Sequence, residues 1–157
     1  DSVASRGLGD VYKRQVPERA RVKADVRRVE SVPGRPDAYM AYVDDGAFAE
    51  GGVFWTRGTS ATEVLVAASG APFLKLTLHT GPRGGVVHLR VDGHDSEVTL
   101  AAEETRTVVV SVPAGMLVVP VRVQSTTGFR PADVVPGATD QRELGCQVRV
   151  ELSDEGA

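Results

Sequence analysis

The sequence predicts an all-β protein: a single antiparallel β-sandwich, jelly-roll-like, with roughly eight to ten strands. Apolar residues, mostly valine, alternate with polar residues along several segments, which is the period of half-buried strands. Short turns rich in Gly, Pro and Asp separate these segments. No long segment has the apolar spacing of an amphipathic helix, so strand–helix–strand units and a parallel sheet are disfavoured.

The clearest alternation lies in the second half of the chain. Residues 73–80 place three leucines on one face, and residues 86–92 repeat the pattern with Val and Leu. Asp92-Gly93 then favours a tight primed hairpin turn, because both positions tolerate positive φ. Further strands are expected near residues 98–100, 108–112, 117–123 and 146–152.

Alternation also predicts burial. The residues expected in the core are Leu74, Leu76, Leu78, Val87, Leu89, Val91, Val108, Val110, Val121, Val148 and Val150. Those expected to face solvent are Lys75, His88, Arg90 and Arg149. Cys146 has the parity of the core residues, so it is expected to be a buried free thiol. Val109 and Val118 break the alternation, which indicates partial cover on an outer face.

Weaker strands are expected at residues 22–29, 38–43, 53–57 and 62–67. Pro120 lacks a backbone donor, so its strand should be an edge strand or bulge there. One long irregular segment remains, residues 125–145, and such loops are usually either functional or held by their own contacts.

The first fifteen residues are expected to be foreign to the protein. Residues 5–15, SRGLGDVYKRQ, resemble the in-frame translation of a transposase-type sequencing adapter, as a metagenomic fragment of bacterial origin would carry. We therefore expect a non-native tail at 1–15, a sandwich domain at 16–153 and a tail at 154–157, with the true amino terminus upstream. Removing residues 1–15 should leave the melting temperature unchanged.

Composition excludes some partners. Residues 1–15 contribute 3 of the 18 basic and 2 of the 21 acidic residues, which leaves a net charge of −4. No Lys/Arg cluster suited to nucleic acid or an anionic membrane is present. No apolar run approaches the roughly 20 residues of a membrane helix.

An ordered set of motifs carries a resemblance to a known module. The motifs are Phe54-Trp55-Thr56-Arg57-Gly58, Leu74-x-Leu76-x-Leu78 before Gly81-Pro82, Phe129-Arg130-Pro131, and Thr139-Asp140-x-Arg142-x-Leu144-Gly145. They resemble a β-sandwich of galactose-binding or jelly-roll type in the carboxy-terminal parts of bacterial membrane glycosyltransferases of the dolichyl-phosphate-mannose transferase type. The resemblance implies a non-catalytic accessory domain on the extracytoplasmic face of a bacterial membrane, partnered by the remainder of its parent chain.

No catalytic motif such as GxSxG, HExxH, CxxC or a Walker loop occurs after residue 15, so no enzymatic activity is expected of this segment. The alternative function is a carbohydrate-binding module. Its candidate ligand-binding residues are Trp55, Arg57, Arg130, Asp140 and Arg142. Trp55 would be a stacking platform for a sugar, although core packing is favoured. The loop charges would grip a polar ligand, although pairing with each other, and with Asp133, is favoured.

Three other groups of residues have both a structural and a functional interpretation. Asp44, Asp45 and Glu50 would either cap a turn, which is favoured, or hold a structural calcium; no other cofactor is expected. His79 and His88 would form a surface metal site only on neighbouring strands, and exposed strand histidines are favoured. The glycine-rich segment 80–85 is expected to be a hairpin loop rather than a phosphate cradle.

Overall fold

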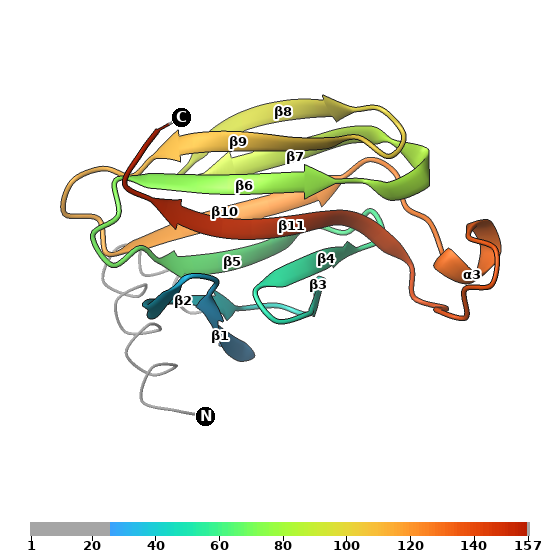
Figure 1. Ribbon diagram of the computed structural model, residues 1–157, viewed down its shortest axis with the longest axis horizontal. Coiled ribbons are helices and arrows are strands. Elements are labelled where there is room, and N and C mark those ends of the chain that lie inside the picture. The colour runs from blue at the N-terminus through green and yellow to red at the C-terminus, as the bar shows by residue number, and fades with distance from the viewer. Residues whose placement is uncertain (1–25, 157) are drawn as a thin grey trace.

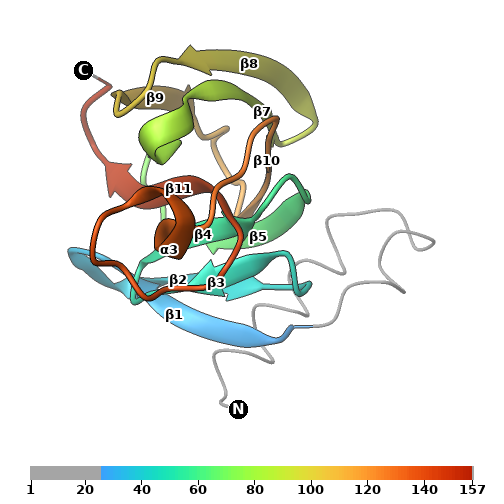
Figure 2. The ribbon, with the colours of Figure 1, turned by 90° about the vertical axis from the view of Figure 1, so that its right-hand side faces the viewer.

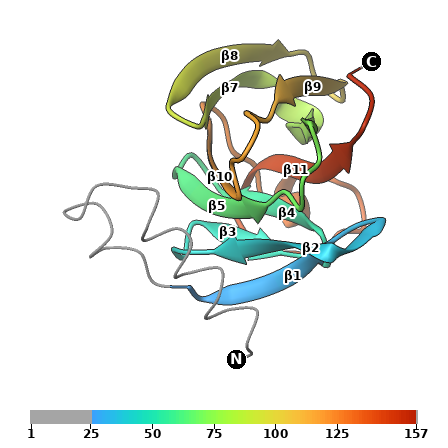
Figure 3. The same cartoon turned by 90° about the vertical axis from the view of Figure 1, so that its left-hand side faces the viewer.

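The computed structural model describes residues 26–156, and these residues form two antiparallel sheets packed face to face (Figure 1). Seen from either end, the sheets are two curved layers (Figures 2 and 3). The predicted all-β sandwich is therefore confirmed. The predictions for residues 1–15, and the first half of the strand expected at 22–29, lie outside the described residues.

One sheet has six strands in the order β1-β2-β5-β10-β7-β8. These strands are β1 (Arg28–Val32), β2 (Arg35–Tyr42), β5 (Thr62–Ala67), β10 (Val118–Ser125), β7 (Gly85–Val91) and β8 (His94–Leu100). The other sheet has five strands in the order β3-β4-β11-β6-β9. They are β3 (Ala47–Ala49), β4 (Val53–Arg57), β11 (Leu144–Ser153), β6 (Phe73–His79) and β9 (Thr105–Ser111). Two short helical turns complete the described chain, η1 (Gly81–Arg83) and α3 (Pro131–Val134).

The core lies between the sheets and follows the predicted alternation. Nine of the eleven predicted core residues are buried, whereas Val108 and Val110 are only partly buried. These two valines lie on β9, which is an edge strand and has a neighbour on one side only. Cys146 is buried and free, as predicted. Of the four residues expected to face solvent, three are exposed and Lys75 is half-buried.

Turn chemistry explains the β7–β8 hairpin. Asp92 and Gly93 have φ values of 49° and 78°, so both central positions are left-handed, as a primed two-residue turn requires. The turn fixes the register that places Arg90 opposite Asp95 and His88 opposite Glu97. It therefore determines which polar side chains share the outer face.

Several sequence predictions were wrong. β10 is a central strand with no register shift against β5, because pairing with β7 begins only at Val121 and the missing donor of Pro120 is not needed there. The 80–85 segment is a crossover between the two sheets rather than a hairpin loop. For the same reason His79 and His88 lie on different sheets and cannot share a metal.

Partial burial on the outer face of a sheet was predicted for Val118 and Val109. It is confirmed for Val118 and wrong for Val109. Val118 is buried in a small cluster with Ala41 and Leu65, outside the main core. Val109 is 39% exposed on the edge strand β9. Among residues 26–156 no helix is long and apolar enough to span a membrane.

Candidate functional site

The long segment 125–145 forms a loop at one end of the sandwich, with α3 at its tip (Figures 1 and 2). It returns to the sheet through a bridge between Phe129 and Leu144. We call the region where it meets the five-stranded sheet the loop-covered corner, and it contains Phe48, Trp55, Arg57, Phe129, Asp140 and Arg142. All five sequence-predicted ligand residues lie in this corner or in the loop, but they do not converge on one site.

Trp55 lies on the outer face of β4, because its neighbours Phe54 and Thr56 point into the interior and are fully buried. Its half-buried ring meets Phe129 edge-on at 5.5 Å and His79 at 6.4 Å between ring centroids. Phe129 also presses on Gly81, where an added Cβ would lie 2.7 Å from the phenyl ring. The core packing favoured for Trp55 was therefore wrong: its ring lies outside the main core and packs against the long loop.

Phe48 lies opposite Trp55 on β3, a strand that the sequence analysis missed because it is only three residues long. Arg57 and Arg142 place their guanidinium carbons 4.3 and 5.0 Å from its ring centroid. The Arg57 Nε donates to the Asp45 carbonyl at 2.9 Å. Cation–π contacts of this kind hold two of the predicted ligand residues against an aromatic ring.

Arg142 is further held by two carboxylates. Its Nη2 donates to Asp140 at 2.7 Å and to Glu50 at 2.9 Å, and its Nε donates to both Asp140 oxygens. The hydrogen bonds from Arg142 lower the pKa of Asp140, and those to Asp140 raise the pKa of Arg142. The predicted pairing of Arg142 with Asp140 is confirmed.

The sequence predicted the wrong ion-pair partner for Arg130. Its guanidinium lies 3.7 Å from Glu143 instead of pairing with Asp133 or Asp140, and both side chains are about half exposed. The backbone of Arg130 is extended, as expected for a residue before proline. Ligand binding by the five predicted residues stays a prediction.

Asp44 caps the β2–β3 turn. Its carboxylate accepts from the backbone N–H groups of Gly46 at 2.9 Å and Glu63 at 3.0 Å, and from the Thr62 hydroxyl at 2.6 Å. The carboxylates of the other two residues lie elsewhere: Asp45 pairs with Arg27, and Glu50 pairs with Arg142. Residues 26–156 contain no group of three or more His, Cys, Asp or Glu side chains arranged for a metal. The structural calcium stays an untested prediction.

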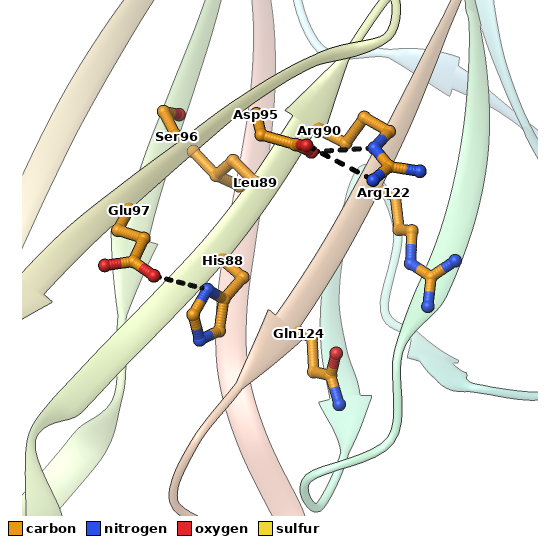
Figure 4. Close-up of a pocket in the computed structure, with 8 residues that line it drawn as sticks. All are labelled: His88, Leu89, Arg90, Asp95, Ser96, Glu97, Arg122 and Gln124. Carbon is orange, nitrogen blue, oxygen red and sulfur yellow. Dashed lines mark hydrogen bonds and ion pairs between the residues drawn. The ribbon is translucent and has the colours of Figure 1, made fainter.

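The six-stranded sheet presents a different feature, which the sequence did not single out. A groove of about 470 Å³ crosses the outer face of β7, β8 and β10 (Figure 4). We call it the sheet groove, and its lining residues are His88, Leu89, Arg90, Asp95, Ser96, Glu97, Arg122 and Gln124. Alternation could have placed each polar side chain outward, but only the non-local pairing of β10 with β7 makes them neighbours.

One ion pair and one histidine–carboxylate contact cross the sheet groove between β7 and β8. Arg90 donates to both carboxylate oxygens of Asp95, at 2.7 and 3.2 Å, and the His88 Nδ1 lies 3.1 Å from Glu97. The hydrogen bonds from Arg90 lower the pKa of Asp95. Gln124 donates to the Thr59 carbonyl at 3.0 Å, so its amide orientation is fixed. The groove therefore offers polar groups in defined positions on rigid strands.

No family model and no curated protein matches the chain. Among solved structures it is similar to the secreted serine protease VesC from Vibrio cholerae, with 10% identity and a TM-score of 0.46 over 89% of this chain and 28% of the protease. It is also similar to the CBM35 module of Cellvibrio japonicus Abf62, with 16% identity and a TM-score of 0.38 over 83% of this chain and 91% of that module. A family 35 carbohydrate-binding module from an environmental isolate has 11% identity and a TM-score of 0.38, over 82% and 87% of the two chains. Such low identities say nothing about which side chains bind a ligand.

Proposed function

We propose that this chain is a non-catalytic carbohydrate-binding module that holds a saccharide in the sheet groove. The observation that carries the proposal is an open groove on a regular sheet whose lining is dominated by arginine, carboxylate, amide and imidazole groups. Saccharide hydroxyls both donate and accept hydrogen bonds. Side chains that present two donors or two acceptors in one plane match two adjacent hydroxyls.

The strands set the spacing of these groups. Arg122, Arg90 and Asp95 form one row across β10, β7 and β8, and Gln124, His88 and Glu97 form a second. Neighbouring groups in a row are about 4.8 Å apart and the rows about 6.7 Å apart, from the strand spacing and twice the rise per residue. Because strands hold these positions and the ion pairs hold the side chains, little ordering is required when a ligand binds.

For the parent protein we keep the proposal that the sequence resemblance supports. The module would be an accessory part of a glycosyltransferase-like protein of a bacterial membrane or envelope, acting on its extracytoplasmic face. The sequence of the intact gene tests this directly: membrane helices upstream support it, whereas a signal peptide followed by a hydrolase domain argues against it.

The binding proposal is tested with the 157-residue chain on a glycan array, followed by calorimetry on the strongest binders. The double variant His88→Ala/Gln124→Ala removes two of the three side chains of the second row and should weaken binding by about tenfold or more, the equivalent of one or two hydrogen bonds. Arg149→Ala is the control, because Arg149 is an exposed arginine of β11, on the opposite sheet. It should change neither binding nor melting temperature.

Two results would redirect the proposal. Binding that survives the groove variant but is lost in Trp55→Ala, with the fold intact, would move the site to the loop-covered corner. Failure of the chain to bind any glycan would leave the structural accessory role as the better explanation.

A further inference from the structure

The floor of the sheet groove is the backbone of the sheet itself. Between the two polar rows, the side chains of Leu89 on β7 and Val123 on β10 point into the core and are buried. Ser96 of β8 lies opposite Leu89 in the register, so it shares that face. The space between the rows is therefore floored by main chain and walled by polar side chains on both sides (Figure 4).

The long direction of the sheet groove runs across the strands. Its lining residues span at most three consecutive positions of any one strand, but they come from three neighbouring strands. The outer two strands are about 9.6 Å apart, whereas the two rows are about 6.7 Å apart along the strands. The β8 end of the groove lies at an edge of the sheet, because β8 has a neighbour on one side only. A linear ligand can therefore lie across β10, β7 and β8.

The charges of the lining are balanced. Two arginines and two carboxylates line the groove, so with a neutral imidazole the formal charge of the lining is zero. Arg90 is bonded to Asp95, and Arg122 lies opposite Glu63 of β5 and interacts electrostatically with Asp95. Such a lining has no net attraction for an anion. It offers both donors and acceptors, which suits the hydroxyl groups of a neutral sugar.

The absence of aromatic rings limits how much one sugar unit contributes. Among the described residues no Trp, Tyr or Phe ring lines the groove, so a sugar has no aromatic face to stack on. Each unit then contributes only a few hydrogen bonds, and each of these contributes little net free energy in water. Binding above the background therefore requires several units to be held at once.

The sheet supplies a matching repeat. Each strand contributes one outward side chain to each row, and these pairs recur about every 4.8 Å across the sheet. The pairs are Arg122 and Gln124 on β10, Arg90 and His88 on β7, and Asp95 and Glu97 on β8. In an extended β-1,4-linked glycan the rings lie in line and advance by nearly one strand spacing. In an α-1,4-linked chain the rings turn out of line, so they do not follow this repeat.

We infer that the sheet groove binds three consecutive units of a neutral, extended β-1,4-linked glycan lying across β10, β7 and β8. This inference rests on the proposed glycan-binding function. One unit lies over each strand, between its two outward side chains. Guanidinium and amide groups donate to the sugar oxygens, and the carboxylates accept from the sugar hydroxyls. Because the strands fix the repeat, an extended chain binds without having to bend.

The first experiment compares linkages and chain lengths. Neutral oligosaccharides of one to six units, β-1,4-linked glucose, mannose and xylose and α-1,4-linked glucose, are titrated into the 157-residue chain by calorimetry. At least one β-linked series should bind about tenfold more tightly than the α-linked series of equal length. Its affinity should rise about tenfold on addition of the third unit and less than about twofold beyond it. Binding should be equal at about 50 and about 500 mM salt, because the ligand carries no charge.

The second experiment removes the position over β10. Arg122→Ala should weaken binding of the preferred trisaccharide by about tenfold, to the level of the disaccharide. The disaccharide itself should lose at most about twofold, because it can still lie over β7 and β8. Arg149→Ala is the matched control, since it removes an exposed strand arginine from the opposite sheet and should change neither affinity. Both variants should keep the wild-type melting temperature.

Three results would overturn the extended-chain inference while the glycan-binding function stands. They are equal or tighter binding of the α-linked series, affinity that rises steadily up to six units, and equal losses for disaccharide and trisaccharide in Arg122→Ala. Tight binding that is confined to branched or acidic saccharides on the glycan array overturns it in the same way. No binding of any saccharide overturns both proposals.

Discussion

The outer faces of the two sheets are both rich in arginine and carboxylate groups, yet they use these groups differently. In the loop-covered corner Arg142 satisfies two carboxylates at once, and Phe48 carries two guanidinium groups. In the sheet groove the Arg90–Asp95 ion pair and the His88–Glu97 contact join β7 to β8, and Arg122 of β10 lies opposite Glu63 of β5. The charges of the corner hold a loop, whereas the charges of the groove lie on strands that their backbone ladders already hold.

The difference follows from connectivity. The loop must be fixed to the sheet over many residues, and side-chain contacts to Trp55, Phe48 and Glu50 supply that fixation. The groove is built on strands whose backbone ladders already fix their positions. Its side chains are therefore not needed for folding and are available to bind a ligand.

The largest expected effect comes from the core that both faces share. Leu76 is fully buried at the middle of β6 and packs within the main core cluster. Leu76→Ala should lower the free energy of unfolding by about 2–5 kcal/mol, through lost burial and the cavity that remains. Urea unfolding followed by circular dichroism measures the change. A cost below about 1 kcal/mol would mean that the sheets do not pack as described.

The next effect separates the two faces. Arg142→Ala leaves Asp140 and Glu50 without their shared partner and should lower the melting temperature by about 3 °C, as expected for a partly exposed network. Arg122→Ala removes an exposed arginine that forms no ion pair within residues 26–156, and it should leave the melting temperature unchanged. Differential scanning calorimetry of both variants checks the contrast. Equal losses in the two variants would contradict the assignment of structural and available charges.

A smaller effect is expected from pH. Because the pKa of Asp140 is lowered in the folded state by hydrogen bonds from Arg142, its contribution to stability is present above the unfolded pKa of about 3.9. It is lost as the pH falls through the lower, folded value. Wild type should therefore lose more stability than Asp140→Asn between about pH 5 and pH 2, measured by urea unfolding. A parallel decline of the two proteins would show that the pair contributes nothing.

Alternation predicted the core well because each strand of a two-sheet sandwich points every second side chain into the interior between the sheets. It placed Leu74, Leu76 and Leu78 correctly, and it failed for Val108 only because β9 is an edge strand. It could not predict which strands are neighbours. The sheet groove requires β10 to pair with β7, a contact between residues more than thirty positions apart.

The candidate residues show the same limit. Trp55 and the loop charges stand out in the sequence because they are rare or clustered, but clustering along the chain also favours pairing with each other. Arg142 and Asp140, two residues apart, pair in this way. Arg122 looks like an ordinary exposed strand residue, and only the register opposite Arg90 makes it distinctive.

The smallest expected effect concerns Cys146, which reports whether the core between the two sheets opens. Its side chain is fully buried on β11, its backbone N–H donates to the buried Thr56 hydroxyl at 2.9 Å, and burial raises the pKa of the thiol to about 12. Little thiolate is present at pH 8, and reagents cannot reach it, so labelling by a disulfide reagent should be negligible in the native protein. Labelling should become complete in urea, and Leu76→Ala should show an intermediate rate because it unfolds more often. Rapid labelling of the wild type would show that the core between the sheets opens in solution, and the packing on which both outer faces rest would then be weaker than described.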